Sequence, residues 1–172
     1  MPGLAGCGVE PNVVVSRPRL PRRLRAVLEL LPHDARRVAD IGAGHGALCA
    51  HLTASADMVI AIEAQAGPFA ELRRNLERWS VCGVDVRYGA GFDPIEESEV
   101  DAAVIAGMGA QRTVGIAAGA PDKQVRWLVL QCMQDMHIVE PWIRGRGWCI
   151  LGRDDVRDHG RVYPTWLVEA AT

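Results

Sequence analysis

The fold of this chain is decided by one stretch, Val38-Ala39-Asp40-Ile41-Gly42-Ala43-Gly44-His45-Gly46. It begins as a short apolar run, passes through three glycines, and continues into residues 47–52, which have the pattern of a helix. A strand, a glycine turn and a helix in this order begin a nucleotide-binding βαβ unit. In such a unit the first glycine allows the tight turn, the second lets a ligand approach the backbone, and the third lets the helix pack near the strand.

A second signal is needed, because glycine trios also occur in plain turns. Glu63 ends the next apolar run, residues 58–62, and lies 21 residues beyond Gly42. An acidic side chain at this distance accepts hydrogen bonds from both hydroxyls of a ribose, although a plain surface acid at a strand end has the same pattern. The glycine turn and Glu63 together predict a site for a nucleotide or nucleoside.

Length and composition indicate one globular domain. The chain has 172 residues, of which 49% are hydrophobic and 23% charged, enough for an ordinary core and unlike a disordered segment. No apolar run approaches the roughly 18 residues of a membrane span, and no secretory signal is visible, so we expect a cytoplasmic protein. The five cysteines form no C-x-x-C pair, and we interpret Cys49, Cys132 and Cys149 as reduced core residues, not metal ligands.

Charge is unevenly distributed. The whole chain carries a net charge of −2, but residues 1–37 contain seven arginines against three acidic residues. Such a basic segment on a mildly acidic protein indicates a patch that faces a polyanion, and a solvated arginine helix is the alternative.

Strands and helices are expected to alternate along the rest of the chain. Residues 1–19 are interpreted as a loose N-terminal extension, and residues 20–172 as one domain. Helical spacing is seen up to Pro32, after the glycine turn to about residue 55, from residue 67 to 79, weakly over 110–119, and over 136–143. Strands are expected at 38–41, 58–63, 84–88, 102–105 and 125–130, and residues 106–109 follow the fourth of these as a glycine turn.

The C-terminal part changes character. Residues 148–151 and 162–168 are predicted to form an antiparallel hairpin, joined by a turn rich in Asp and Gly, with Pro164 marking a bulge or a late strand start. Strands that alternate with helices and end in a hairpin indicate an α/β fold, a Rossmann-like doubly wound sheet of about seven strands.

With these elements in place, the sequence resembles Rossmann-type S-adenosylmethionine-dependent methyltransferases, which carry such a hairpin. More narrowly it resembles the bacterial tRNA (adenine(22)-N1)-methyltransferase family. The residues that carry the resemblance are Arg23-Leu24, residues 39–42 with His45, Ala64 with residues 67–69, residues 104–109, Leu130-Gln131, and Tyr163. The family implies S-adenosyl-L-methionine as cofactor and tRNA as partner, with no metal and no membrane. The sequence leaves the oligomeric state open.

The resemblance also indicates which residues form the site. We expect the cofactor at Asp40, Ile41, Gly42, Gly44, His45, Glu63, Ala64, Gly89, Ala90, Gly91, Ala106, Gly107 and Met108. The substrate is expected at Arg22, Arg23, Gly107, Met108 and Gly109, and the residues assigned to catalysis are Asp40, His45 and Arg23. Adenine N1 already carries a lone pair, so positioning, acceptor groups near the base and the small residues 106–109 matter more than a strong base.

The sequence departs from the family at three points. Gly44 stands where the family has Asp before the histidine, Ala90 stands where it has Asp between two glycines, and no C-terminal coiled-coil extension follows. Three alternatives to tRNA methylation stay open. Gly44 and Ala90 fit a binding module that has lost activity, and the compact size and a pI of about 6.2 fit a small-molecule methyltransferase. The third alternative is a dehydrogenase, since strand, glycine turn and Glu63 alone fit it.

Overall fold

In the computed structural model, which describes residues 16–170, strands and helices alternate along the chain. The α-helices are α1 (Arg22–Leu30), α2 (Ala47–Leu52), α3 (Ala66–Arg78), α4 (Ala110–Ala117) and α5 (Val139–Gly145). Two 3₁₀ turns, η1 (Pro121–Lys123) and η2 (Met136–Ile138), lie among them. The strands are β1 (Arg37–Ile41), β2 (Met58–Glu63), β3 (Val84–Tyr88), β4 (Ala102–Gly109), β5 (Trp127–Gln134), β6 (Cys149–Asp158) and β7 (Arg161–Glu169).

One mixed sheet contains all these strands, in the order β3-β2-β1-β4-β5-β7-β6. Strands β1 to β5 are parallel, and β7 is antiparallel to both β5 and β6. The strand order reverses between β1 and β4, and ligands of open α/β sheets bind outside the carboxyl ends of the strands at such a reversal. The predicted doubly wound sheet of seven strands with a terminal antiparallel hairpin is confirmed.

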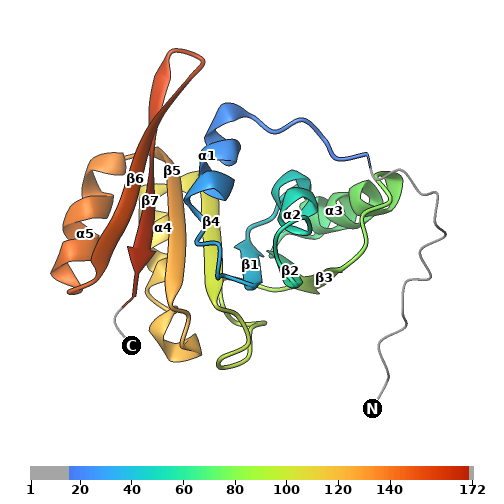
Figure 1. The fold of residues 1–172 in the computed structure, drawn as a ribbon, viewed down its shortest axis with the longest axis horizontal. Coiled ribbons are helices and arrows are strands. Elements are labelled where there is room, and N and C mark those ends of the chain that lie inside the picture. The colour runs from blue at the N-terminus through green and yellow to red at the C-terminus, as the bar shows by residue number, and fades with distance from the viewer. Residues whose placement is uncertain (1–15, 171–172) are drawn as a thin grey trace.

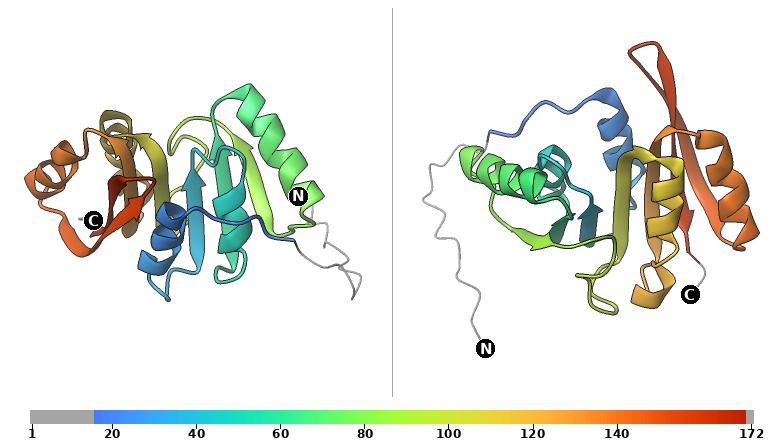
Figure 2. Two further views of the ribbon diagram at one scale, coloured as in Figure 1. Left: turned by 90° about the horizontal axis from the view of Figure 1, so that it is seen from above. Right: turned by 180° about the vertical axis from the view of Figure 1, so that it is seen from behind.

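Helices cover both faces of the sheet (Figures 1 and 2). Helices α1, α2 and α3 pack on one face, through buried side chains that include Leu24, Leu48 and Leu72. Helices α4 and α5 pack on the other, through side chains that include Val114 and Ile143. Because the central parallel strands are covered on both sides, their residues are apolar throughout instead of alternating with polar ones.

The segment that precedes α1 is attached to the domain. Ser16 N donates to Trp79 O at 3.2 Å, Arg17 Nε donates to Ala50 O at 2.9 Å, and His51 Nε2 lies 2.7 Å from Pro18 O. The expectation of a loose extension up to residue 19 is therefore wrong for residues 16–18, and its first fifteen residues lie outside the described part of the chain.

The glycine-rich end of the fourth strand differs from its prediction as a turn. Strand β4 continues through Ala106 to Gly109, and β5 begins and ends later than expected, so that Met108 pairs with Cys132 and Gly109 with Gln134. Pairing with a buried neighbour outweighs the low strand propensity of glycine here. The register shifts on both sides of Met108, and such an irregularity bends the strand locally.

The terminal hairpin is longer than predicted. Most of the stretch rich in Asp and Gly belongs to β6, and a two-residue turn, His159-Gly160, joins the strands with positive φ angles of 48° and 75°. Charged residues fit β6 because it is the edge strand and one of its edges meets water.

Two smaller predictions in this region are wrong. The bulge lies between Ile150 and Gly152, while Pro164 pairs regularly with Asp155. The proline is tolerated because β7 pairs with β5 only from Thr165 onward, so its missing N–H removes no bond to that strand. Cys149 is exposed, whereas Cys49 and Cys132 are buried as expected.

Candidate active site

The glycine turn lies at the reversal of strand order, directly after β1. Gly42 N and Ala43 N both donate to Ile62 O, at 2.8 and 3.0 Å, which folds the turn back over the end of β2. Gly42 has a φ of 76°, and a Cβ on it would overlap the Cε of Met108. Only glycine adopts this φ without strain and also leaves room for the Met108 side chain from β4.

Glu63, at the end of β2, is fixed by the backbone of the turn. Its Oε2 accepts a hydrogen bond from Gly44 N at 3.1 Å, and its Oε1 accepts one from Gln65 N at 2.9 Å. The side chain is 7% exposed, and its carboxylate oxygens have further lone pairs for a ligand. It borders a hollow of about 160 Å³, the Glu63 hollow, lined by Ile41, Gly42, Glu63, Ala64, Gln65, Gly89, Gly91, Met108, Arg112 and Ile116.

Asp40 lies in β1, two residues before Gly42. It borders a second hollow of about 180 Å³, the Asp40 hollow, lined by Arg23, Leu24, Asp40, Gly42, Ala43, Gly44, His45, Ala47, Leu48, Ala106 and Gly107. Its side chain is buried, and its Oδ2 has no hydrogen-bond partner in the described part of the chain. Burial raises the pKa of Asp40 to about 7, a hydrogen bond from the Cys49 backbone opposes this shift, and the negative charge of Glu63 adds to it.

These two hollows meet at Gly42, which lines both of them. A buried carboxylate oxygen without a partner is costly, so Asp40 is suited to a ligand that brings a donor or a cation. Glu63 in turn is suited to a pair of hydroxyls. The residues therefore fit an elongated ligand with a ribose at one end and an ammonium group at the other.

Arg23 is held at the edge of the Asp40 hollow. Its Nη1 donates to Oε1 of Gln131 at 3.2 Å, and it lies 3.8 Å from where a Cβ on Gly107 would be. Gln131 is fully buried, and its Nε2 donates to Cys132 O at 2.7 Å, which fixes the orientation of the amide. A side chain from α1 is thus positioned against β4 by a side chain from β5.

Most of the remaining predicted residues line one of the two hollows. Those at the Glu63 hollow are Ile41, Ala64, Gly89, Gly91 and Met108, and those at the Asp40 hollow are Gly44, His45, Ala106 and Gly107. His45 is exposed, and its backbone oxygen accepts a hydrogen bond from Asn75 of α3. Ala90 and Gly109 line neither hollow, and Arg22 faces a separate one.

Sequence reasoning missed several residues that border the site. Gln65, Arg112 and Ile116 line the Glu63 hollow, and Leu24, Ala43, Ala47 and Leu48 line the Asp40 hollow. The position of Gln65 could have been predicted from the sequence, because this residue follows the strand-end acid Glu63 by two residues. Arg112 carried no such signal, since its place depends on where α4 begins after the extended β4.

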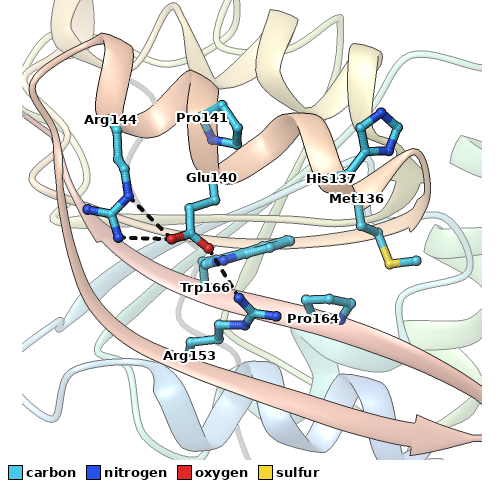
Figure 3. A pocket seen from close by; sticks show the side chains of 8 residues that line it. All are labelled: Met136, His137, Glu140, Pro141, Arg144, Arg153, Pro164 and Trp166. Atoms are coloured by element: carbon cyan, nitrogen blue, oxygen red, sulfur yellow. Dashed lines mark hydrogen bonds and ion pairs between the residues drawn. The ribbon is translucent and has the colours of Figure 1, made fainter.

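A further hollow, of about 490 Å³, lies between α5 and the terminal hairpin and contains none of the predicted site residues (Figure 3). Glu140, at the wall of this hollow, forms ion pairs with both Arg144 and Arg153, and Arg153 also pairs with Asp155. The charges that line this hollow are thus paired with one another or with a neighbour in the chain. Within residues 16–170, no three His, Cys, Asp or Glu side chains are placed to hold a metal ion. No helix in that range is long and apolar enough to cross a membrane.

The fold and the two hollows define a methyltransferase domain. Residues 20–165 match the family described as "Methyltransferase domain", and the chain belongs to this family. The narrower resemblance found in the sequence is confirmed as homology to the tRNA (adenine(22)-N(1))-methyltransferase of Bacillus subtilis strain 168. The two chains are 30% identical over 158 residues, which cover 88% of this chain and 66% of the relative.

Solved structures agree with this relationship. The crystal structure of the B. subtilis M1A22 tRNA methyltransferase TrmK superposes with a TM-score of 0.79 at 30% identity, covering 89% of this chain and 67% of that chain. Streptococcus pneumoniae Sp1610, provisionally assigned as a tRNA (m1A22) methyltransferase and solved in complex with S-adenosyl-L-methionine, gives a TM-score of 0.81 at 26% identity. That match covers 88% of this chain and 73% of the other. The chain thus spans about two thirds of the length of these relatives.

Proposed function

We propose that this chain is an S-adenosylmethionine-dependent methyltransferase that transfers a methyl group to N1 of an adenine in tRNA, and that residues 20–172 form its catalytic unit. One observation carries the proposal. Two carboxylates, Glu63 and Asp40, lie near the carboxyl ends of adjacent parallel strands, and each borders a hollow that Gly42 also lines. The homology to a tRNA methyltransferase supports the choice of substrate.

The chain's own residues account for cofactor binding. Glu63, oriented by Gly44 N and Gln65 N, accepts hydrogen bonds from the two ribose hydroxyls. Asp40, whose Oδ2 is otherwise without a partner, binds the ammonium of the methionine moiety. Met108 and Ile116 provide apolar contact in the Glu63 hollow, where the adenine ring binds. When bound, the cofactor supplies an electrophilic methyl group on a sulfonium.

The target base binds in the Asp40 hollow, between Arg23 and the strand edge at Ala106 and Gly107. These small residues leave space for a flat ring, and their backbone carbonyls are acceptors near the positive charge that develops on the adenine. Arg23, fixed by Gln131, positions the nucleotide through its sugar or phosphate, and His45 contacts it at the rim. Because N1 carries a free lone pair, catalysis rests on positioning more than on proton transfer.

The departures from the family motifs favour one alternative, a binding module without activity. Ala90 gives this alternative little support, because the residue is exposed and lines neither hollow. Gly44 is the departure that bears on activity, because this residue lines the Asp40 hollow and its N–H donates to Glu63. We place the protein in the cytoplasm, where a tRNA-modifying enzyme meets its substrate.

The test compares substrate classes. The protein is incubated with methyl-labelled S-adenosylmethionine and either bulk tRNA or a protein-free extract of small molecules. We expect label in tRNA, with the Asp40→Asn variant as a control of reduced transfer. Label in the small-molecule fraction alone supports a small-molecule methyltransferase, and cofactor binding without transfer to either fraction supports the inactive module.

A further inference from the structure

A hollow of about 440 Å³ lies between the start of α1 and the tip of the β6-β7 hairpin. It is lined by Arg19, Leu20, Pro21, Arg22, Arg25, Asp158 and His159, and we name it the arginine cleft. In Figure 1 the hairpin projects beyond the sheet beside α1. The two walls of the cleft therefore come from segments more than 130 residues apart in sequence.

Helix α1 runs along the hairpin. Near its end, the Cδ2 of Leu30 lies 3.3 Å from where a Cβ on Gly152 would be, and near its start Arg22 shares the cleft with the turn residue His159. Arg161 is the cross-strand partner of Asp158 and therefore lies on the same face of the hairpin, the face toward α1. The hairpin side of the cleft thus also carries an arginine, Arg161.

The charges of this cleft differ from those of several other arginine clusters in the protein. Arg36, Arg37 and Arg87 form ion pairs with nearby carboxylates, and the two arginines of the hollow beside α5, Arg144 and Arg153, share Glu140 (Figure 3). In contrast, no hydrogen bond or ion pair of the side chains of Arg19, Arg22, Arg25 and Arg161 is found in the described part of the chain, and all four are exposed. Asp158 is the acid that lines the cleft, so a net positive charge remains.

We propose that the arginine cleft holds the phosphodiester backbone of RNA beside the nucleotide in the active site. The choice of RNA as the polyanion rests on the proposed function. Arg22 and Arg25 of α1 line the cleft, whereas Arg23 between them lines the Asp40 hollow, so one helix presents cations to both places. An RNA strand can therefore run from the hairpin tip to the base site along α1, held by unpaired guanidinium groups.

The experiment compares two double variants that remove the same charge from exposed helix positions. Arg22→Gln/Arg25→Gln changes the cleft, and Arg73→Gln/Arg74→Gln changes α3, far from it. Binding of an unmodified tRNA transcript is measured over a series of salt concentrations. The plot of log K against log salt has a negative slope, and each lost phosphate contact makes that slope shallower by about 0.7 to 0.9. The slope of the cleft double variant should therefore be shallower by about 1.4 to 1.8, and that of the α3 double variant should be nearly unchanged.

The hairpin wall is tested with variants of opposite sign. Arg161→Gln should flatten the slope further, and Asp158→Asn should tighten RNA binding because it removes the cleft's negative charge. Equal effects of the two double variants, or weaker binding by Asp158→Asn, would overturn the cleft. Cofactor binding is measured for every variant to confirm that it is folded. If the two double variants differ in slope as expected but the parent protein transfers no methyl group to tRNA, the proposed function is overturned while the cleft remains supported.

Discussion

Replacing Glu63 by Gln tests the cofactor site most specifically. In the parent protein one carboxylate accepts from Gly44 N and Gln65 N and has lone pairs left for the ribose. Glutamine keeps the shape but has one oxygen. Its NH₂ group must therefore face one of the two backbone donors, and the negative charge is lost.

The size of the effect follows from these contacts. A hydrogen bond to a charged group contributes about 1.5 to 3 kcal/mol, and about 1.4 kcal/mol corresponds to a tenfold change in affinity. We therefore expect the Kd for S-adenosylhomocysteine, measured by calorimetry, to rise between about 10-fold and 100-fold in Glu63→Gln. Glu63→Asp, which keeps the charge at a shorter reach, should fall between this variant and the parent.

The matched control is Glu71→Gln, which removes the same charge from an exposed position of α3. It should leave the Kd unchanged, and the melting temperature of each variant shows whether the glycine turn stays folded. The reasoning is refuted if Glu63→Gln binds within about threefold of the parent while both proteins melt at the same temperature.

Four further predictions concern the same site. The pKa of Asp40 is raised to about 7, so its ionised form, which the cofactor ammonium prefers, is lost below this pH; calorimetric affinity should fall about tenfold per pH unit below 7 in the parent and stay flat in Asp40→Asn. A raised native pKa also means that the contribution of Asp40 to stability is present below the unfolded pKa and lost as pH rises through 7, so in chemical denaturation Asp40→Asn should be more stable than the parent at pH 8 but not at pH 4. Gly44→Asp should raise the single-turnover rate of methyl transfer, because a carboxylate there stabilises the positive charge that develops on the base, and an unchanged rate would show that Gly44 marks no catalytic loss. The same change should lower stability by roughly 1 kcal/mol, because the φ of +56° is unfavourable for Asp, although the nearest atom to an added Cβ is 3.9 Å away. Gln131→Met should lower kcat/KM on tRNA without changing cofactor affinity, and combining it with Arg23→Ala should add little, since Gln131 acts by holding Arg23; additive losses would contradict this.

The part of the site that depends on chain order was predictable from sequence. A strand, a glycine turn and an acid at the next strand end are local patterns, and parallel strands bring their carboxyl ends together, so Asp40, Gly42 and Glu63 were placed correctly near one another. The terminal hairpin was predictable for a similar reason, since alternation and turn residues are local signals.

The parts that depend on pairing between distant segments were not predictable. Residues 106–109 have the composition of a turn, yet partnership with β5 keeps them in the sheet. The contact between Arg23 and Gln131 joins positions 108 residues apart, and no periodicity reports it. Likewise, the acidic and basic residues near Asp158 had the composition of a loop, and only the long hairpin brings them beside α1.

Identification of the methylated atom tests the central claim most directly. A tRNA transcript is incubated with excess protein and S-adenosylmethionine for a single turnover, digested to nucleosides, and analysed by mass spectrometry against standards of 1-methyladenosine and N6-methyladenosine. The account predicts 1-methyladenosine, at up to one per transcript, and its loss in Asp40→Asn. No methylated nucleoside, or N6-methyladenosine alone, would contradict it.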